Sequence, residues 1–277
     1  MKLGVTIFFT DRSMGPAAAA REVEARGFHS LYVPEHTHIP TSRVTPSPTG
    51  EAELPDEYKR TLDPFIALAA AAAATSRIKL GTGVSLIAQH DPIVLAKEIA
   101  TLDLISAGRV VLGIGFGWNR DEMESHGVDF RTRRARVRET VLAMQALWNG
   151  DTGGFEGEHV HVPESWSWPK PVQRPGPPIL IGGGAGPKLF SHIAEYGDGW
   201  IPIGGRGVAA ALPALRRAVE EAGRDPATLQ LVVLGTIPTA EKLERFASMG
   251  VTEVVARVPA GPAEEILPVL DAYAQLI

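Results

Sequence analysis

The feature that most constrains this chain is a regular alternation of short apolar runs and helical patterns along its whole length. Eight runs fit buried strands, at residues 3–9, 30–34, 78–86, 109–118, 179–181, 199–203, 229–234 and 253–258. Helical patterns follow them, and two of the helices begin at Asp-Pro pairs, Asp63-Pro64 and Asp91-Pro92, which suit a helix start. Such alternation predicts a parallel sheet, and eight units in 277 residues predict a single α/β domain over residues 1–277, a (β/α)8 TIM barrel. An open doubly wound sheet is the alternative.

Two long segments interrupt the alternation, one after the second strand and one after the fourth helix. Residues 39–60 are polar and contain several prolines, and residues 152–178 are rich in Pro, Trp and Gly. Long irregular segments in compact domains are often functional lids, so we expect substrate determinants in both. Within the second segment, His159 and His161 alternate with Val160 and Val162, which predicts an exposed hairpin.

The composition excludes several classes of function. The formal net charge is −5, so there is no basic footprint for nucleic acid, and the absence of cysteine removes disulfides, thiolate catalysis and Cys-ligated metals. The alanine-rich run at residues 67–74 is too short to span a membrane. A strand-like pattern begins at residue 3 and leaves no room for a secretion signal, so we expect a cytoplasmic protein.

The fourth apolar run ends in alternate glycines and a tryptophan. Gly113, Gly115 and Gly117 precede Trp118. Because glycine has no Cβ, a strand end built this way can lie close to a flat ligand, and the indole adds a large rigid surface. This pattern predicts a bound ring system, and a tight turn of packed glycines is the alternative.

The fifth apolar run leads into a second glycine-rich segment, Gly182-Gly183-Gly184-Ala185-Gly186-Pro187-Lys188, which enters a helix. The free N–H groups and partial positive charge of a helix start favour an anion, and Lys188 could add charge. We therefore predict a phosphate site here, with a flexible turn as the alternative. The glycine spacing matches neither a Walker loop nor a dinucleotide-binding fingerprint.

Polar side chains follow the strand ends, where the active site of a barrel lies. Glu35, His36 and His38 follow the second strand, and Asp121 and Glu122 come shortly after Trp118. His36 is best interpreted as an acid–base group or hydrogen-bond donor, because imidazole titrates near neutral pH. Asp121 and Glu122 are candidates for the pocket mouth, on a segment that is otherwise a solvated helix face.

A metal site is the competing interpretation of the histidines. In barrel hydrolases an His-x-His pair binds metal together with further His and Asp residues on later strands. Here the pair follows the second strand, no histidine follows strands five to eight, and His192 falls within a predicted helix. We therefore expect no metal.

Taken together, these motifs resemble the bacterial luciferase-like superfamily, in the branch that uses the deazaflavin coenzyme F420. The matching pieces, in family order, are Tyr32-Val33-Pro34-Glu35-His36, Leu80-Gly81-Thr82-Gly83-Val84, the 112–118 and 169–178 segments, Ile181-Gly182-Gly183-Gly184 and Gly197-Asp198-Gly199-Trp200. The resemblance implies a (β/α)8 barrel with F420, or alternatively FMN, across the strand ends. It also implies a homodimer, for which the six alanines at residues 69–74 would allow close helix approach.

The resemblance implies roles for individual residues as well. His36 would stand near the reactive carbon of the ring, and Gly83-Val84 would form a non-prolyl cis peptide behind it. The implied cofactor contacts are Thr82, Gly83, Val84, Gly115, Gly117, Trp118, Gly183, Gly184, Ala185 and Gly186, with the last three at the phosphate. The candidate catalytic residues are His36, Glu35, Trp118 and Glu122.

The chain also departs from the family pattern. Sugar-phosphate dehydrogenases of the branch carry Glu in place of Trp118 and often Asp in place of Glu35, so a sugar-phosphate substrate is not expected and the acidic partner of His36 stays open. The leading hypothesis is an F420-dependent oxidoreductase that moves a hydride to or from a small organic substrate. The alternatives are a monooxygenase using reduced FMN and oxygen, a flavin-binding barrel without turnover, and a metal-dependent hydrolase.

Overall fold

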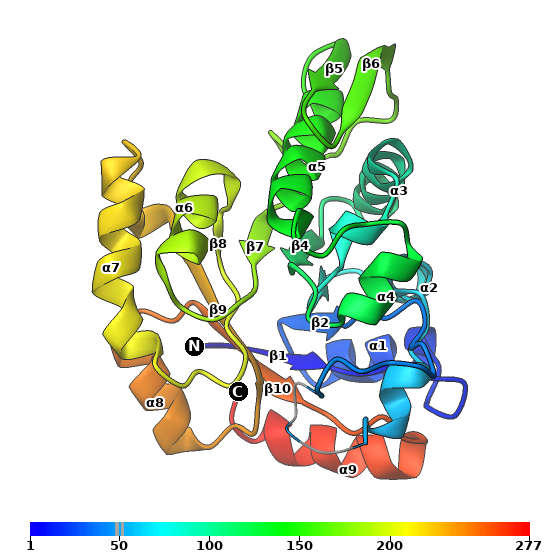
Figure 1. The fold of residues 1–277 in the computed structure, drawn as a ribbon. Coiled ribbons are helices and arrows are strands. Elements are labelled where there is room, and N and C mark those ends of the chain that lie inside the picture. The colour runs from blue at the N-terminus through cyan, green and yellow to red at the C-terminus, as the bar shows by residue number, and fades with distance from the viewer. Residues whose placement is uncertain (48–49, 51–52) are drawn as a thin grey trace.

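Eight parallel strands close into a barrel in the computed structural model, which describes residues 1–47, 50 and 53–277 (Figure 1). The order around the barrel is β1-β10-β9-β8-β7-β4-β3-β2. The barrel strands are β1 (Lys2–Thr6), β2 (Ser30–Val33), β3 (Lys79–Thr82), β4 (Val110–Ile114), β7 (Ile179–Ile181), β8 (Gly199–Trp200), β9 (Gln230–Thr236) and β10 (Glu253–Arg257). The predicted TIM barrel is therefore confirmed, and the open sheet is excluded.

Helices cover the outside of the barrel. They are α1 (Pro16–Ala25), α2 (Pro64–Ala74), α3 (Pro92–Ile105), α4 (Arg120–Ser125), α5 (Arg133–Trp148), α6 (Pro187–Tyr196), α7 (Val208–Glu221), α8 (Ala240–Ser248) and α9 (Ala263–Ala274). Short 3-10 helices lie at η1 (Asp56–Lys59), η2 (Ile87–Gln89) and η3 (Pro226–Thr228). None of the described helices is both long and apolar enough to cross a membrane.

The predicted helix starts carry the expected side-chain caps. The Asp63 carboxylate accepts a hydrogen bond from the Ile66 N–H, and Asp91 accepts from the N–H groups of Ile93 and Val94. Each cap satisfies backbone donors that have no partner inside the helix, and the proline that follows each aspartate suits the first helical position. Sequence and local structure agree here because capping needs only neighbouring residues.

Two apolar layers stabilise the barrel. An outer layer fills the space between strands and helices and includes fully buried Trp148 and Leu95. A smaller inner cluster lies within the barrel and is formed by Tyr32, Val111, Leu180, Ile201, Val232, Leu234 and Val255. Gly81 is required beside it, because a Cβ there would lie 2.3 Å from the Tyr32 ring. Both faces of the strands are thus buried, which explains their continuous apolar runs.

The two insertions have different structures. Part of residues 152–178 forms an antiparallel hairpin, β5 (Thr152–Glu156) with β6 (His161–Trp166), which confirms the hairpin prediction. The hairpin packs along α5 and projects away from the barrel (Figure 1). Of the predicted loop at residues 39–60, positions 48, 49, 51 and 52 lie outside the described residues, and the remainder contains η1. Because the hairpin points away, we now expect the substrate determinants in the 39–60 segment.

Candidate functional site

The C-terminal ends of four neighbouring strands bring the predicted residues together. The parallel register places Val33 of β2 beside Thr82 of β3, and Ile114 of β4 beside Ile181 of β7. The segments that follow these strand ends therefore share one end of the barrel. They carry Glu35 and His36, the Gly83-Val84 bond, the 115–118 segment and the 182–186 loop.

His36 is held by a buried carboxylate from α4. Its Nδ1 lies 2.9 Å from Oε2 of Glu122, and both side chains are buried, with Glu122 fully enclosed. The open question about the acidic partner of His36 is answered by Glu122, which lies 86 residues further along the chain. A carboxylate on one ring nitrogen fixes the tautomer and the ring orientation, so the other nitrogen, Nε2, is the one that can exchange a proton with a ligand.

Two aromatic rings flank His36. The Trp118 ring lies 5.9 Å from the imidazole in an edge-on arrangement, and the Tyr58 ring of η1 lies 5.2 Å away. Trp118 keeps partial exposure at the strand end, as expected for a residue that borders a ligand. Tyr58 was missed by the sequence analysis, because its segment has no regular pattern. Its sole signal was a tyrosine in the predicted lid.

Glu35 faces away from His36 and forms a separate cluster. Its carboxylate accepts hydrogen bonds from Ser85 Oγ at 2.6 Å and Leu86 N–H at 2.7 Å, and His90 Nε2 lies 2.6 Å from its other oxygen. Burial raises the pKa of Glu35, but the hydrogen bond and charge of His90, with the other donors, outweigh it and leave this pKa below its usual value. This geometry does not support direct catalysis by Glu35, and Ser85 and His90 were not among the predicted site residues.

The loop after β3 adopts the cis peptide that the family resemblance implied. The Gly83-Val84 bond is cis, and Val84 packs against the inner cluster of the barrel. A Cβ on Gly115 would lie 2.6 Å from the Val84 side chain, and one on Gly182 would lie 3.1 Å from it. The two glycines therefore make room for Val84 at the barrel mouth. Thr82, just before this bond, donates its hydroxyl to Gly113 O at 2.7 Å and is fully engaged inside the barrel wall.

The loop at residues 182–186 is open at its tip. The Trp200 indole N–H donates to Gly183 O at 3.1 Å and fixes the base of the loop. At Gly184 and Gly186 an added Cβ would meet nothing within 4 Å. Within the described part of the chain, Gly184, Ala185 and Gly186 donate no backbone hydrogen bond. Free donors before a helix start suit an anion, which agrees with the phosphate prediction.

The 39–60 segment is tied to α4 on one side. Asp121 accepts hydrogen bonds from Thr45 Oγ1 at 2.6 Å and from the Thr45 N–H at 3.2 Å. Asp121 therefore holds the segment, whereas Glu122, its neighbour, holds His36. Of the two candidates for the pocket mouth, Glu122 points inward and is completely buried, and residues 124–127 form the solvated face expected for the rest of the segment.

The remaining histidines take separate positions. His38 Nε2 lies 2.6 Å from Ser125 Oγ, which joins the chain after β2 to α4. His192 lies within α6, as predicted, and its Nδ1 lies 2.9 Å from the Tyr196 hydroxyl. Among the described residues, no group of three or more His, Asp or Glu side chains is arranged to hold a metal ion.

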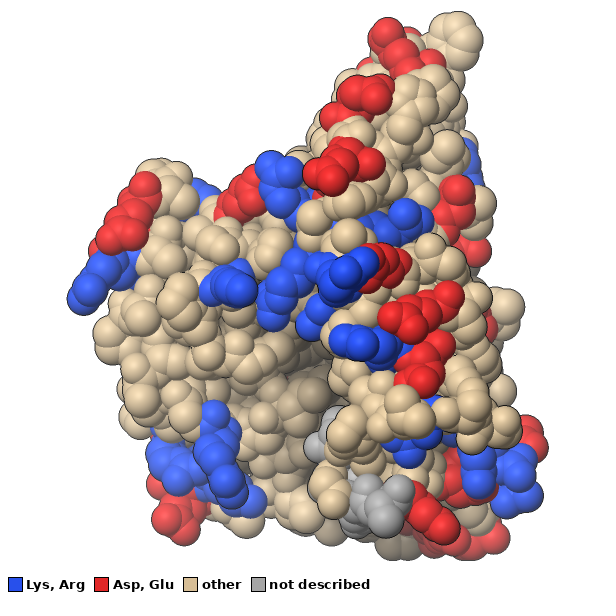
Figure 2. Space-filling view, in the orientation of Figure 1, with Lys and Arg blue, Asp and Glu red and all other residues tan. Residues whose placement is uncertain are grey.

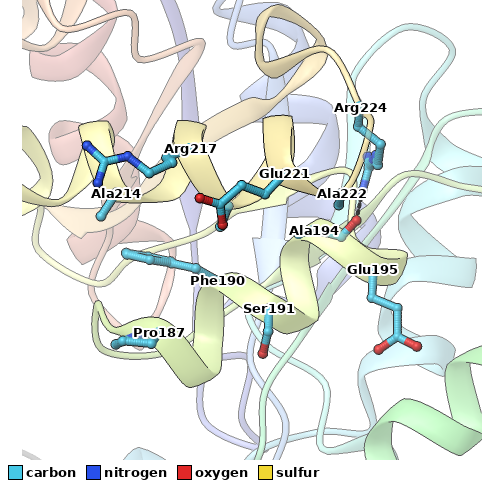
Figure 3. Close-up of a pocket in the computed structure, with 11 residues that line it drawn as sticks. Pro187, Phe190, Ser191, Ala194, Glu195, Ala214, Arg217, Glu221, Ala222 and Arg224 are labelled. Carbon is cyan, nitrogen blue, oxygen red and sulfur yellow. Dashed lines mark hydrogen bonds between the residues drawn. The ribbon is translucent and has the colours of Figure 1, made fainter.

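A groove of about 760 Å³ lies elsewhere, on the outside of the barrel between α6 and α7 (Figure 3). Phe190, Ala194 and Ala214 are among its lining residues. Arg224, at one end, is already bound to the carbonyl oxygens of Ile193, Ala194 and Gly197. The groove also has polar lining residues, but Glu195 is paired with Arg138 and Arg224 with backbone carbonyls, whereas the barrel mouth brings together most of the predicted site residues, so the mouth is the better candidate site.

Two relatives by sequence cover most of the chain. An uncharacterised protein of Mycobacterium tuberculosis is 48% identical over 99% of this chain and 98% of its own length. The F420-dependent hydroxymycolic acid dehydrogenase of the same species is 29% identical over 90% of this chain and 62% of its own length.

Solved structures share the fold. The monooxygenase RslO1 of Streptomyces bottropensis matches with a TM-score of 0.81 at 22% identity, covering 100% of this chain and 98% of its own. An F420-dependent secondary alcohol dehydrogenase, solved with an F420-acetone adduct, matches with a TM-score of 0.79 at 18% identity and the same coverage. The model of the luciferase-like monooxygenase family matches residues 3–254. The chain therefore belongs to the luciferase-like monooxygenase family.

Proposed function

We propose that this protein is an F420-dependent oxidoreductase that interconverts an alcohol and a carbonyl group on a small organic substrate. The hydrogen bond between His36 Nδ1 and Glu122 Oε2 carries this proposal. It supplies an oriented imidazole at the mouth of a barrel whose family consists of oxidoreductases and monooxygenases. Bound F420 would supply the hydride donor or acceptor. The protein's own side chains would therefore have to transfer one proton to or from the substrate.

His36 can accept or donate that proton at Nε2. The Glu122 carboxylate accepts from Nδ1–H, so the lone pair of the neutral ring lies on Nε2, and among the described residues none hydrogen-bonds that atom. In alcohol oxidation Nε2 takes the hydroxyl proton, and Glu122 then stabilises the charged imidazolium. In carbonyl reduction the same atom gives the proton back. Trp118 and Tyr58 restrict the ring and limit water around it.

The barrel mouth fits a flat cofactor with a phosphate. Val84 is partly buried against the inner cluster at the barrel mouth, and Gly115 and Gly182 make room for its side chain. Gly184, Ala185 and Gly186 leave open space and free backbone donors at the edge. We assign the ring to the first set of residues and the phosphate to the second.

Titration of the purified protein with F420 and with FMN, followed by absorbance, tests the cofactor. Gly184→Asp should weaken binding at least tenfold, about 1.4 kcal/mol, because it places a carboxylate at the proposed phosphate position. Gly184→Ala is the matched control, since a Cβ there has open space, and it should bind like the wild type. Equal affinity of the Asp and Ala variants would show that the phosphate lies elsewhere.

A monooxygenase using reduced FMN and oxygen is the second candidate, favoured by the family model and by the match to RslO1. Binding of FMN without binding of F420 would select it. Tight cofactor binding with no turnover of any substrate would instead favour the non-catalytic barrel.

We further propose a homodimer. Of the alanines at residues 69–74, Ala71 and Ala72 are buried in the chain's own packing of α2, and the other four keep some exposure. Large apolar side chains remain exposed nearby, at Ile66 of α2 and Val94 and Ile105 of α3. Ile105→Glu should then lower the mass measured by light scattering at micromolar concentration from dimer to monomer, and a monomeric wild type would contradict the proposal.

A further inference from the structure

Helix α5 begins with arginines where most helices favour acids. Its first residues are Arg133, Arg134, Ala135 and Arg136, its first turn contains no acidic residue, and Thr132 makes no capping hydrogen bond. A helix start already carries partial positive charge, so added cations are unfavourable there unless an anion is bound. Arg136 is used internally, since it donates to Ala88 O at 2.9 Å. Arg133 Nη1 likewise donates to Phe130 O at 2.6 Å, so the donors that need another explanation are Arg133 Nε and Arg134 Nη1.

These two arginines keep unused donors. Arg133 Nε and Arg134 Nη1 are buried and have no hydrogen-bond partner, and among the described residues no carboxylate forms an ion pair with either one. Other arginines nearby are paired: Arg131 with Asp129, and Arg138 with Glu195. Buried donors without partners are rare and indicate a ligand or another special role.

Aromatic rings hold both guanidinium groups in place. Arg134 Cζ lies 4.1 Å from the centre of the Phe116 ring, and Arg133 Cζ lies 3.7 Å from that of Phe130. Stacking on a ring leaves the edge of a guanidinium free for carboxylates or phosphates. The two groups are thus oriented before any ligand arrives, which reduces the entropy lost on binding.

The pair lies next to the proposed cofactor site. Phe116 belongs to the segment that follows β4, and its ring is 5.0 Å from His192 of α6. Helix α6 begins immediately after the 182–186 loop. In Figure 2, Lys and Arg side chains form a run across this face of the molecule, above a hollow. Through Phe116 and His192, Arg134 at the start of α5 is thus linked to α6, the helix that the 182–186 loop enters.

From the free donors, the ring stacking and the position of these residues, we infer that Arg133 and Arg134 bind a chain of carboxylates. This chain is the glutamate tail that F420 carries beyond its phosphate. The inference rests on the proposed function and deepens it. FMN ends at its phosphate and has no acidic chain to reach these residues. The two arginines would then help the protein to select F420 over FMN. An anionic substrate could present the same chemistry, so the test separates the two sources.

The test compares F420 that carries several glutamates with the form that ends at the phosphate group, using cofactor fluorescence to measure Kd. The wild type should bind the tailed form at least tenfold more tightly, and the preference should shrink as salt increases. Arg134→Gln and the double variant Arg133→Gln/Arg134→Gln should reduce or abolish the preference and leave the Kd of the short form unchanged. Unchanged binding of the short form also shows that the variants are folded.

Arg138→Gln is the matched control, because Arg138 lies on the same helix but is paired with Glu195, and it should keep the preference. Equal wild-type affinity for both forms would overturn the inference. So would a preference that survives in the double variant. If the arginines served an anionic substrate, a γ-linked glutamate peptide would inhibit turnover without displacing tailed F420, and that result also overturns the assignment. Failure of both F420 forms to bind would instead contradict the proposed function.

Discussion

Two histidine–carboxylate pairs lie at the same end of the barrel, yet they have different surroundings. In one, His36 meets Glu122 beside Trp118 and Tyr58 at the mouth. In the other, His90 meets Glu35 behind the loop after β3. Glu35 and His36 are adjacent in the chain, but their side chains point to different partners. The same chemical pair therefore occurs in two different surroundings, and we propose a catalytic role only for the one at the mouth.

The hydrogen bonds of the two carboxylates show the difference. Glu35 has three partners, Ser85, Leu86 and His90, and so anchors the loop that carries the cis Gly83-Val84 bond. Glu122 Oε2 lies against His36, and its Oε1 is buried without a hydrogen-bond partner among the described residues. A fully satisfied buried carboxylate is typical of a structural role, and an incompletely satisfied one is more typical of a functional site.

The largest expected effect is a difference in turnover between variants of the two histidines, His36 and His90. His36→Ala should lower turnover about 10²–10⁴-fold, the usual range for a positioned acid–base group, with cofactor affinity retained. His90→Ala is the matched comparison and should keep most of the rate. Full turnover in His36→Ala would end the relay assignment, and a loss of cofactor affinity equal to the loss of rate would indicate a packing role.

Removing the buried Glu35 carboxylate tests whether this residue has a structural role. Glu35→Ala leaves the Ser85 hydroxyl, the Leu86 N–H and His90 without their acceptor, so we expect a loss of about 3 kcal/mol in the free energy of unfolding. Urea denaturation measures it. Turnover per folded, cofactor-loaded molecule should fall much less than in His36→Ala. A selective loss of turnover with unchanged stability would return Glu35 to the catalytic residues.

Substitution of Glu122, the partner of His36 at the barrel mouth, should have a smaller effect on turnover. Glu122→Gln keeps an acceptor for Nδ1–H but removes the charge that stabilises the imidazolium, so we expect turnover to fall about 10–100-fold. Steady-state kinetics with saturating cofactor measures this change. Asp121→Asn is a suitable control, because Asp121 binds the 39–60 segment and not His36. Equal losses in the two variants would mean that the whole of α4, and not the dyad, matters.

The smallest effect concerns how the stability contributed by the buried His90–Glu35 pair depends on pH. Burial lowers the pKa of His90, but the hydrogen bond and charge of Glu35 raise it above its usual 6.5, whereas Glu35 itself falls below its usual 4.5. A depressed carboxylate pKa adds stability that is lost as pH falls through the folded-state value. A raised histidine pKa adds stability that is lost as pH rises through the folded-state value. The pair should therefore stabilise most between about 4.5 and 6.5.

His90→Gln should reveal this window. The difference in unfolding free energy between wild type and variant should be about 1 kcal/mol near pH 5.5 and smaller near pH 9. Urea denaturation at both pH values measures it. A difference that grows with pH would have the wrong sign and would contradict an ion pair between His90 and Glu35.

The sequence by itself determined the elements and their order. Apolar runs buried on both faces, Asp-Pro helix starts and alternate glycines at strand ends are local patterns, and the barrel follows from their repetition. Strand ends were placed less accurately: the run at residues 78–86 continues past β3, which stops at Thr82. An apolar run indicates which residues are buried, but it does not indicate the residue at which the chain leaves the sheet.

Only the tertiary structure decided which side chains meet. Glu122 and His36 are 86 residues apart, and nothing local distinguishes Glu122 from Asp121, which binds the 39–60 segment instead. Likewise, the neighbours Glu35 and His36 find partners on different elements, because their side chains leave the chain in different directions. That Arg133 and Arg134 form no ion pair among the described residues is equally invisible in the sequence, since Arg131 and Arg138 are the same residue type and are paired. Partner choice depends on side-chain direction and on elements distant in the chain, which a linear pattern does not encode.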